Sequence, residues 1–515
     1  MTKMNRRKFL KILGQGTAAV SMGMGLSGST WIRSAGAQNR NEPDPKHPDW
    51  NDWEFYYPGK YDAQDTKVLK EFRAQLALIN NKGSINISDL VSGKLEGKPG
   101  IGRSTKITSD SMMMAANTYG AENPMWCEAN YAKNTKWGAM AMPFGSGPGP
   151  TGLPAMPKSE GIGDYMVVSA HNDTVTYYKP IYEGDTIYSV IEEEHCIDIS
   201  PPQGSHYRSF TMGGWGRFYN QKGELVGEGA CILKESFRRR KDPAKRHANG
   251  THAWESPDWW SRPKYNYTDK DWEKIIGIWK NEKIRGAQTL YWDDVNIGDE
   301  PAPRAVGPII TDVETDILMS SKLSTDLKQN VLDPQTFKKM VKNKQGIYVL
   351  PEYVEKKPAP APPTTTAGGV PELGNRDGRC VLMNAVAAYW AGGMIINWMG
   401  DDGWLQRIGW DIMELPPGTS ESINFDEDPT IIPPIPMENR PPLFDKYPYM
   451  DKVPYMRGKR AAWHALEGDL VISKACVADK YRQGNEYFVD LIWWCETLNN
   501  YLIEEGFATV KLPKR

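Results

Sequence analysis

Residues 383–404, MNAVAAYWAGGMIINWMGDDGW, form an almost continuously apolar stretch. Large apolar side chains recur there at helical spacing, at Val386, Tyr389, Trp390, Met394, Ile395 and Trp398. Only Asn384 and Asn397 interrupt them. A helix that is apolar almost all round must be covered by other elements, so the stretch predicts a buried helix.

The segments around this stretch predict the sheet that covers it. Residues 470–481 (LVISKACVADKY) and 486–496 (EYFVDLIWWCE) are rich in β-branched and aromatic residues, which favour strands. Earlier in the chain, residues 165–199 alternate polar and apolar side chains, and a hairpin is expected around 220–223. We therefore expect a buried helix wrapped by a curved antiparallel sheet.

The same pattern occurs twice in the chain. YEGDT at 182–186 matches LEGDL at 466–470, and each precedes a long strand. GWGRFYNQKGELVGEGACILK (214–234) likewise resembles LIWWCETLNNYLIEEGFATVKL (491–512). A period of about 280 residues is too long for a solenoid and indicates a duplicated fold. A helix over residues 110–118 is expected to be the first-half counterpart of 383–404.

The first residues predict export. NRRKFLK at 5–11 is a twin-arginine sequence, residues 12–26 are weakly apolar, and Ala35-Gly36-Ala37 is a small-x-small cleavage site. Cleavage would start the mature protein at Gln38, without stable membrane insertion. The alternative is a lone membrane anchor, but the apolar run is short and polar residues break it. Twin-arginine export carries folded proteins, so we expect a periplasmic or other extracytoplasmic protein.

Charge and cysteine usage exclude several classes of function. The formal net charge is −2, which gives no support for a nucleic-acid partner. The six cysteines form no CxxC pair, so no metal site and no cofactor is expected, although an oxidising compartment permits a disulfide. The high aromatic content favours large cores, interfaces or an aromatic-lined pocket. A homodimer, or a complex with another exported protein, is the expected assembly.

Several motifs together resemble one family. They are AENPMW (121–126), KPIYEGD (179–185), YWDDVNIGD (291–299), NWMGDDGWL (397–405) and GFATVKLPKR (506–515). Their order is similar to that in the MaoC-like acyl dehydratases and type 2 enoyl-CoA hydratases. The resemblance implies an α+β tandem (double) hotdog, in which each half is a central helix wrapped by an antiparallel sheet.

The resemblance also implies a division of the chain. The expected segments are a signal peptide (1–37), an N-terminal arm and lead-in (38–108), a first hotdog (109–245), a Trp-rich connector (246–284) and a second hotdog with Pro-rich insertions (285–515).

The catalytic pair of that family is absent here. Active members carry an Asp and a His five residues apart, a pair that can move protons near neutral pH. At the matching positions this chain has Ala121 and Trp126, while Asn123 and Pro124 are retained. In the second half, the corresponding Pro/Thr-rich loop at 357–378 contains no His. Because acyl-CoA is a cytoplasmic substrate, export also argues against ordinary enoyl-CoA hydration.

Other residues are candidates for the missing chemistry. Glu122 can supply a carboxylate, but an exposed turn residue is the alternative. His171 and Asp173, two apart on a strand, share one side and can form an acid/base pair, or merely bond a loop. Arg217 can hold an anionic substrate or form a salt bridge across strands. Asn123 and Trp126 are the remaining candidates for substrate binding.

Asp401 and Asp402 end the predicted helix at 383–404. Carboxylates are disfavoured at a helix C-terminus, so Arg407 or a ligand is expected as their partner, within a structural turn. The leading hypothesis is an exported hydratase or dehydratase (a hydro-lyase) of a small, non-CoA molecule. The alternative is a non-catalytic hotdog protein that binds a ligand or joins a complex.

Overall fold

A computed structural model of the 515-residue chain describes most residues in the ranges 83–141, 165–198, 208–239, 265–309, 317–351, 381–411 and 460–515. Scattered positions between 63 and 81, and residue 354, are also described. The predicted signal peptide and the loop at 357–378 lie outside the described residues, so the predictions made for them stay predictions.

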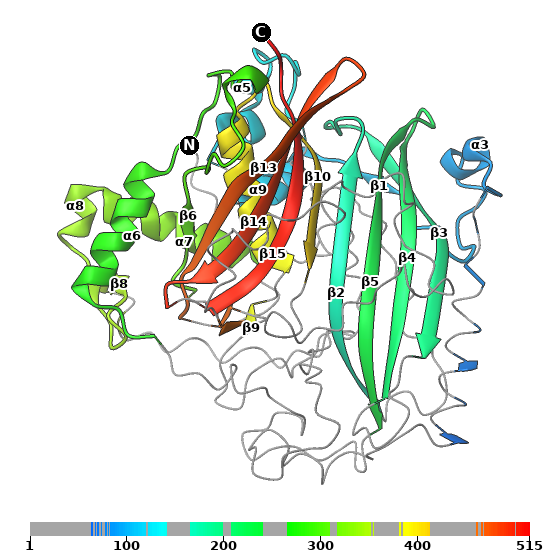
Figure 1. Cartoon of the computed structure of the whole chain (residues 1–515), viewed down its shortest axis with the longest axis horizontal. Coiled ribbons are helices and arrows are strands. Elements are labelled where there is room, and N and C mark those ends of the chain that lie inside the picture. The colour runs from blue at the N-terminus through cyan, green and yellow to red at the C-terminus, as the bar shows by residue number, and fades with distance from the viewer. Residues whose placement is uncertain are drawn as a thin grey trace.

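The strands of the main sheet are β1 (Thr105–Lys106), β2 (Tyr165–Tyr177), β3 (Thr186–Asp198), β4 (Arg208–Asn220), β5 (Leu225–Arg239), β6 (Arg304–Val306), β10 (Trp404–Asp411), β11 (Arg460–Ala461), β13 (Val471–Gln483), β14 (Glu486–Thr497) and β15 (Tyr501–Lys511). They pair in the order β1-β3-β4-β5-β2-β10-β15-β14-β13-β6, and β11 pairs in parallel with β15 (Figure 1). Two small sheets join β7 (Val341–Lys342) to β8 (Tyr348–Val349) and β9 (Val381–Leu382) to β12 (Ala465–Leu466).

The helices of the described residues are α3 (Ile87–Val91), α4 (Ser109–Tyr119), α5 (Ala129–Ala132), α6 (Asp269–Asn281), α7 (Ile317–Leu332), α8 (Pro334–Phe337) and α9 (Ala385–Met399), with 3-10 turns η2 (Pro124–Trp126) and η5 (Trp292–Asp294). Helix α6 lies within the predicted connector and begins with a capping box at Thr268 and Asp271. None of these helices has the length and apolar character needed to cross a membrane.

Helix α9 is the buried helix predicted from residues 383–404. Residues 388–397 are all buried, and the helix contacts β10, β13, β14 and β15. Trp390 and Ile395 have no exposed surface and belong to the main core together with Val489 and Leu491 of β14. The chain is an α+β tandem hotdog, with helices on the concave face of antiparallel sheets.

The two Glu-Gly-Asp turns confirm the predicted repeat. Gly184 and Gly468 both have φ 91°, a conformation that glycine adopts without steric cost. The amide of Gly184 donates to the carbonyl of Ile107 at 2.9 Å, and that of Gly468 donates to the carbonyl of Ile309 at 2.7 Å. Each turn therefore fastens the chain just after the edge strand of its own half.

The helix over 110–118 has a different counterpart from the one expected. Helix α4 follows β1, and α7 follows β6, the equivalent edge strand, so α4 corresponds to α7 rather than to α9. Helix α4 packs against both α7 and α9. Apolar character suggested the pairing with α9, but position relative to the repeated edge strand decides the equivalence.

The halves share one continuous sheet, because β2 pairs with β10. A transverse row of directly opposed polar residues crosses this junction, consisting of Asp490, Thr509, Arg407, Thr176, Glu228 and Arg217. Side chains alternate along strands, and the neighbours Val175, Ile408 and Leu491 belong to the main core. The transverse row therefore lies on the sheet face opposite α9.

Candidate functional site

The retained turn of the family motif ties the two halves together. Asn123 is buried, and its Oδ1 accepts from the amide of Met125 at 3.0 Å, which caps η2. Its Nδ2 donates to Oδ1 of Asp401 at 2.9 Å. Because both polar atoms have partners within the protein, the side chain holds the start of η2 against the end of α9.

Asp401 receives further bonds from the first half. The hydroxyl of Tyr131 donates to its Oδ2 at 2.7 Å, and the Trp137 indole donates to its carbonyl at 2.8 Å. The hydrogen bond to the Asp401 carboxylate, with burial second, raises the pKa of Tyr131. The carboxylate at the helix end thus has a specific partner set, but it comes from the first half and not from Arg407. The Nε of Arg407 donates to Thr176 at 2.9 Å in the transverse row.

Trp126 stands at the position where the resemblance described above would place a His. Its side chain is 1% exposed and belongs to the main core with Met125. An indole at this depth contributes packing, since a large aromatic side chain buries more apolar area than any other residue type. The position therefore has a structural role in this chain.

Glu122 lies in a buried ionic group that we call the seam network, made of Glu122, Lys328, Glu282 and Arg304. The ammonium of Lys328, on α7, is 2.7 Å from Glu122 and 2.5 Å from Glu282. Glu282 is also 3.1 Å from the guanidinium of Arg304 on β6. Glu122 is therefore not an exposed turn residue, because it joins the first half to the second through Lys328.

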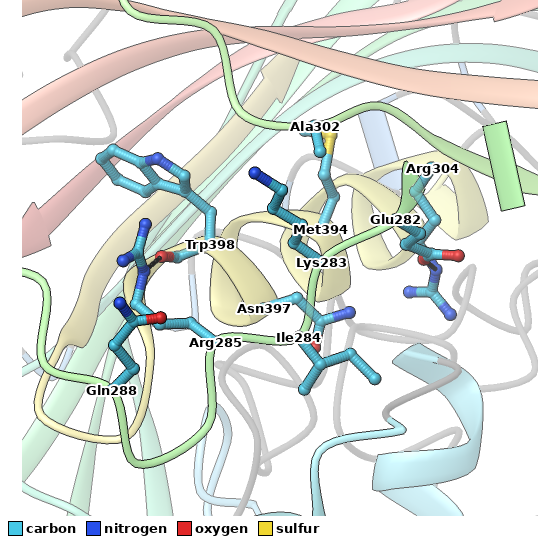
Figure 2. Close-up of a pocket in the computed structure, with 10 residues that line it drawn as sticks. All are labelled: Glu282, Lys283, Ile284, Arg285, Gln288, Ala302, Arg304, Met394, Asn397 and Trp398. Carbon is cyan, nitrogen blue, oxygen red and sulfur yellow. Dashed lines mark hydrogen bonds and ion pairs between the residues drawn. The ribbon is translucent and has the colours of Figure 1, made fainter. Parts of the chain in front are cut away.

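Two residues of the seam network, Glu282 and Arg304, also line a chamber of about 440 Å³. Its lining residues are Glu282, Lys283, Ile284, Arg285, Gln288, Ala302, Arg304, Met394, Asn397 and Trp398 (Figure 2). Figure 2 shows Arg285, Gln288 and Trp398 toward one end, Glu282 and Arg304 toward the other, and Asn397 between them. The volume lies within the range of small-molecule sites.

The positions of the other predicted residues are less informative. The backbone of β2 places position 171 opposite Leu233 and position 173 opposite Cys231 and Trp410, but the side chains of His171 and Asp173 are outside what the structure describes. Their proposed acid/base role stays a prediction. Arg217 lies 3.5 Å from Glu192 and 3.7 Å from Glu228, on the face opposite α9. Arg217 therefore forms cross-strand salt bridges, which were the alternative to a role in substrate binding.

Metal chemistry has no visible site in the described residues. No group of three or more His, Cys, Asp or Glu side chains there is placed to hold a metal ion. Cys127, Cys476 and Cys495 are free thiols.

The sequence pointed to only part of the chamber. Asn397 stood out as an interruption of the apolar helix, and Glu122 as the carboxylate beside the lost Asp. Glu282, Arg285 and Lys328 carried no motif, because they come together only through the packing of α6, α7 and β6.

Comparisons with known proteins concern the fold. No protein-family model matches the sequence, and no curated protein matches it significantly. Among solved structures, a MaoC-like dehydratase has 12% identity and a TM-score of 0.40, over 82% of this chain and 100% of the other. A MaoC domain protein of Chloroflexus aurantiacus has 11% identity and a TM-score of 0.39, over 80% and 94%. A Mycobacterium tuberculosis protein described as a double hotdog has 7% identity and a TM-score of 0.34, over 80% and 95%. The strand order and the repeated turns establish the tandem hotdog described above.

Proposed function

We propose that this protein is a MaoC-like hydro-lyase, a hydratase or dehydratase, whose chemistry takes place in the chamber between α9 and the segment that follows α6. The observation that carries the proposal is the position of Glu282. Glu282 is one of the residues that line the chamber, and its carboxylate is held by both Lys328 and Arg304. A carboxylate residue in the wall of a small-molecule cavity is a candidate general base, and the two cations hold this one in a fixed position.

The chamber geometry supports water elimination as follows. Glu282 removes the proton from the carbon next to an electron-withdrawing group, and the carbon–oxygen bond to the neighbouring hydroxyl breaks. The same carboxyl then delivers that proton to the departing hydroxyl, so that water leaves, a double bond forms and the carboxylate is regenerated. Hydration is the reverse sequence. Lys328 and Glu122 do not line the chamber and act as positioning residues for Glu282.

The catalytic candidates of the first half remain part of the proposal. Glu122 acts through Lys328, to which it is paired at 2.7 Å. His171 and Asp173 belong to β2, and their contribution is tested separately by His171→Ala. Loss of turnover in that variant would move the acid/base chemistry toward the first half.

A test uses the mature protein from residue 38 with a panel of small hydroxy compounds and their dehydration products. The wild type should interconvert one such pair, and Glu282→Gln should lower kcat at least about 100-fold, the usual worth of a general base. Glu273→Gln, an exposed position on α6, is the matched control and should keep wild-type kcat. Turnover that Glu282→Gln leaves unchanged would remove Glu282 from the mechanism.

The second candidate function is ligand binding without catalysis. It is favoured by Trp126, which is fully packed where the family has its catalytic His. A ligand that binds the chamber tightly and is recovered unchanged, with no effect of Glu282→Gln on any reaction, would support this function instead.

Export also belongs to the proposal. The twin-arginine sequence and the Ala35-Gly36-Ala37 site support a periplasmic protein that begins at Gln38, crosses the membrane folded, and works as a homodimer or with another exported protein. N-terminal sequencing and the mass of the protein from the periplasmic fraction test both points. A chain that keeps residues 1–37 would contradict cleavage.

A further inference from the structure

Arg285 is a cation without a counterion in the part of the chain that the structure describes. Its Nε donates to the carbonyl of Trp398 at 2.7 Å, and no carboxylate of the described residues lies within salt-bridge distance. Burial lowers the pKa of the Arg285 guanidinium, with the more distant charge of Asp294 acting in the opposite direction. The two terminal nitrogens of the guanidinium form a fork that matches a carboxylate.

Asn397 is the second unusual group of the chamber. Its side chain is 3% exposed, and neither Oδ1 nor Nδ2 has a hydrogen-bond partner in the described part of the chain. Leaving a buried amide unpaired costs about 1–3 kcal/mol, so such a group is expected to have a partner in the functional state. The amide presents one donor group and one acceptor to whatever enters the chamber.

The net charge of the residues that line the chamber also favours an anionic ligand. Lys283, Arg285 and Arg304 contribute three positive charges to the lining, against one negative charge from Glu282. Arg304 is already paired with Glu282, which leaves Lys283 at the exposed rim and Arg285 deeper inside. An anion that enters between them meets a net positive wall.

We infer that the chamber binds a small hydroxy carboxylate as the free acid anion. Arg285 holds the carboxylate through its terminal nitrogens, and Asn397 accepts from the ligand's hydroxyl through Oδ1 while Nδ2 donates to an oxygen of the ligand. Both unpaired groups then gain partners, and the ligand reaches along the chamber toward Glu282. This inference names the class of substrate for the chamber. The word substrate rests on the function proposed above.

The first test needs no variant and measures selectivity. Isothermal titration of the mature wild-type protein compares 3-hydroxybutyrate and crotonate with crotonamide, a neutral molecule of nearly the same shape. The carboxylates should bind at least about tenfold more tightly than the amide, because only they neutralise Arg285. Equal affinity for crotonate and crotonamide, or binding of neither at millimolar concentration, would overturn the inference.

The variants then locate the site. Arg285→Met should weaken crotonate binding at least about tenfold, Arg285→Lys should restore part of the affinity, and Asn397→Asp should weaken it by placing a negative charge beside the ligand. Lys280→Met, an exposed cation on α6, is the control and should bind as the wild type does. Unchanged binding in Arg285→Met would place the ligand elsewhere and overturn the inference.

The outcome for reaction chemistry is read separately. Suppose that carboxylates bind selectively, that Arg285→Met abolishes this binding, and that no ligand is turned over. This result would support the binding inference and contradict the proposed hydro-lyase activity. Turnover of a neutral compound, with no selectivity for carboxylates, would support the proposed reaction and overturn the inference.

Discussion

The transverse row and the seam network both connect the two halves, on opposite faces of the sheet. They differ in whether their charged residues line the chamber. Several polar groups of the transverse row are paired within the sheet, although Oδ2 of the buried Asp490 has no hydrogen-bond partner among the described residues. Thr509 donates to Asp490 at 2.8 Å, Arg407 donates to Thr176 at 2.9 Å, and Tyr178 donates to Glu228 at 2.5 Å. The contacts of the seam network are equally short, but two of its residues, Glu282 and Arg304, also line the chamber.

This difference suggests that the charged residues of the transverse row serve the structure, whereas those of the seam network serve function. Buried ion pairs contribute little net stability, because desolvation offsets their attraction, whereas breaking one leaves an uncompensated charge. In the transverse row, hydrogen bonds and salt bridges from neighbouring strands pair most of the polar groups, so the row helps to fix the register of the strands. In the seam network, the cations hold a carboxylate at a cavity wall, where it can meet a ligand.

The largest effect is expected from Lys328→Met. It leaves Glu122 without its partner and Glu282 with Arg304 alone, so unfolding free energy should fall by about 3–5 kcal/mol. Urea denaturation measures it, with Lys338→Met, an exposed lysine beyond α8, as the control expected within about 0.5 kcal/mol of wild type. A loss below about 1 kcal/mol would show that water or another cation replaces Lys328.

The next effect concerns the pH dependence of the transverse row. Burial, opposed by the hydrogen bond from Thr509 and by Arg407, raises the pKa of Asp490 to about 6 from an ordinary value of 3.8. Because the folded-state pKa is the higher one, the contribution of Asp490 to stability is greatest below pH 4 and is lost as pH rises through 6. Two pKa units correspond to about 3 kcal/mol.

Asp490→Asn tests this directly, because asparagine can still accept from Thr509 but does not titrate. The variant should be more stable than the wild type at pH 7, and the gap should close toward pH 4. Denaturation at pH 4, 5, 6 and 7 measures it, while Asp479 and Tyr481 nearby are left intact. Parallel stability curves for the two proteins would contradict the raised pKa.

The smallest loss of unfolding free energy is expected for an exposed ion pair with the same N–O distance as a pair in the seam network. Lys94 Nζ lies 2.7 Å from Asp89, the same separation as Lys328 from Glu122, but the Lys94 side chain is 71% exposed. Lys94→Met should change unfolding free energy by no more than about 0.5 kcal/mol. A loss as large as that of Lys328→Met would mean that distance, rather than burial, controls both pairs.

Much of the fold could be predicted from local sequence. The apolar period of residues 383–404 and the two Glu-Gly-Asp turns are short-range signals, and each determines its own element. The equivalence of α4 with α7 could not be read in this way, because it depends on which edge strand precedes each helix.

The site was less predictable because its contacts are long-range. Glu122 and Lys328 are 206 residues apart, and Asn123 and Asp401 are 278 apart. The motifs reach Glu122 but not Lys328, and they reach both Asn123 and Asp401 without indicating that the two side chains contact each other. Asn397 is the exception, because a polar residue in an otherwise apolar helix is visible from the sequence alone.

The pairing of β2 with β10 also determines how a ligand can reach the chamber. A hinge that swings the halves apart would have to break the ladder of five residue pairs from Arg407–Thr176 to Asp411–Asn172. Backbone hydrogen bonds in the middle of a large sheet open rarely. The exposed residues of the chamber lining, Lys283, Ile284 and Gln288, lie in the segment at 283–288, which belongs to no described strand. The lining of the chamber is therefore exposed to solvent at the segment that follows α6.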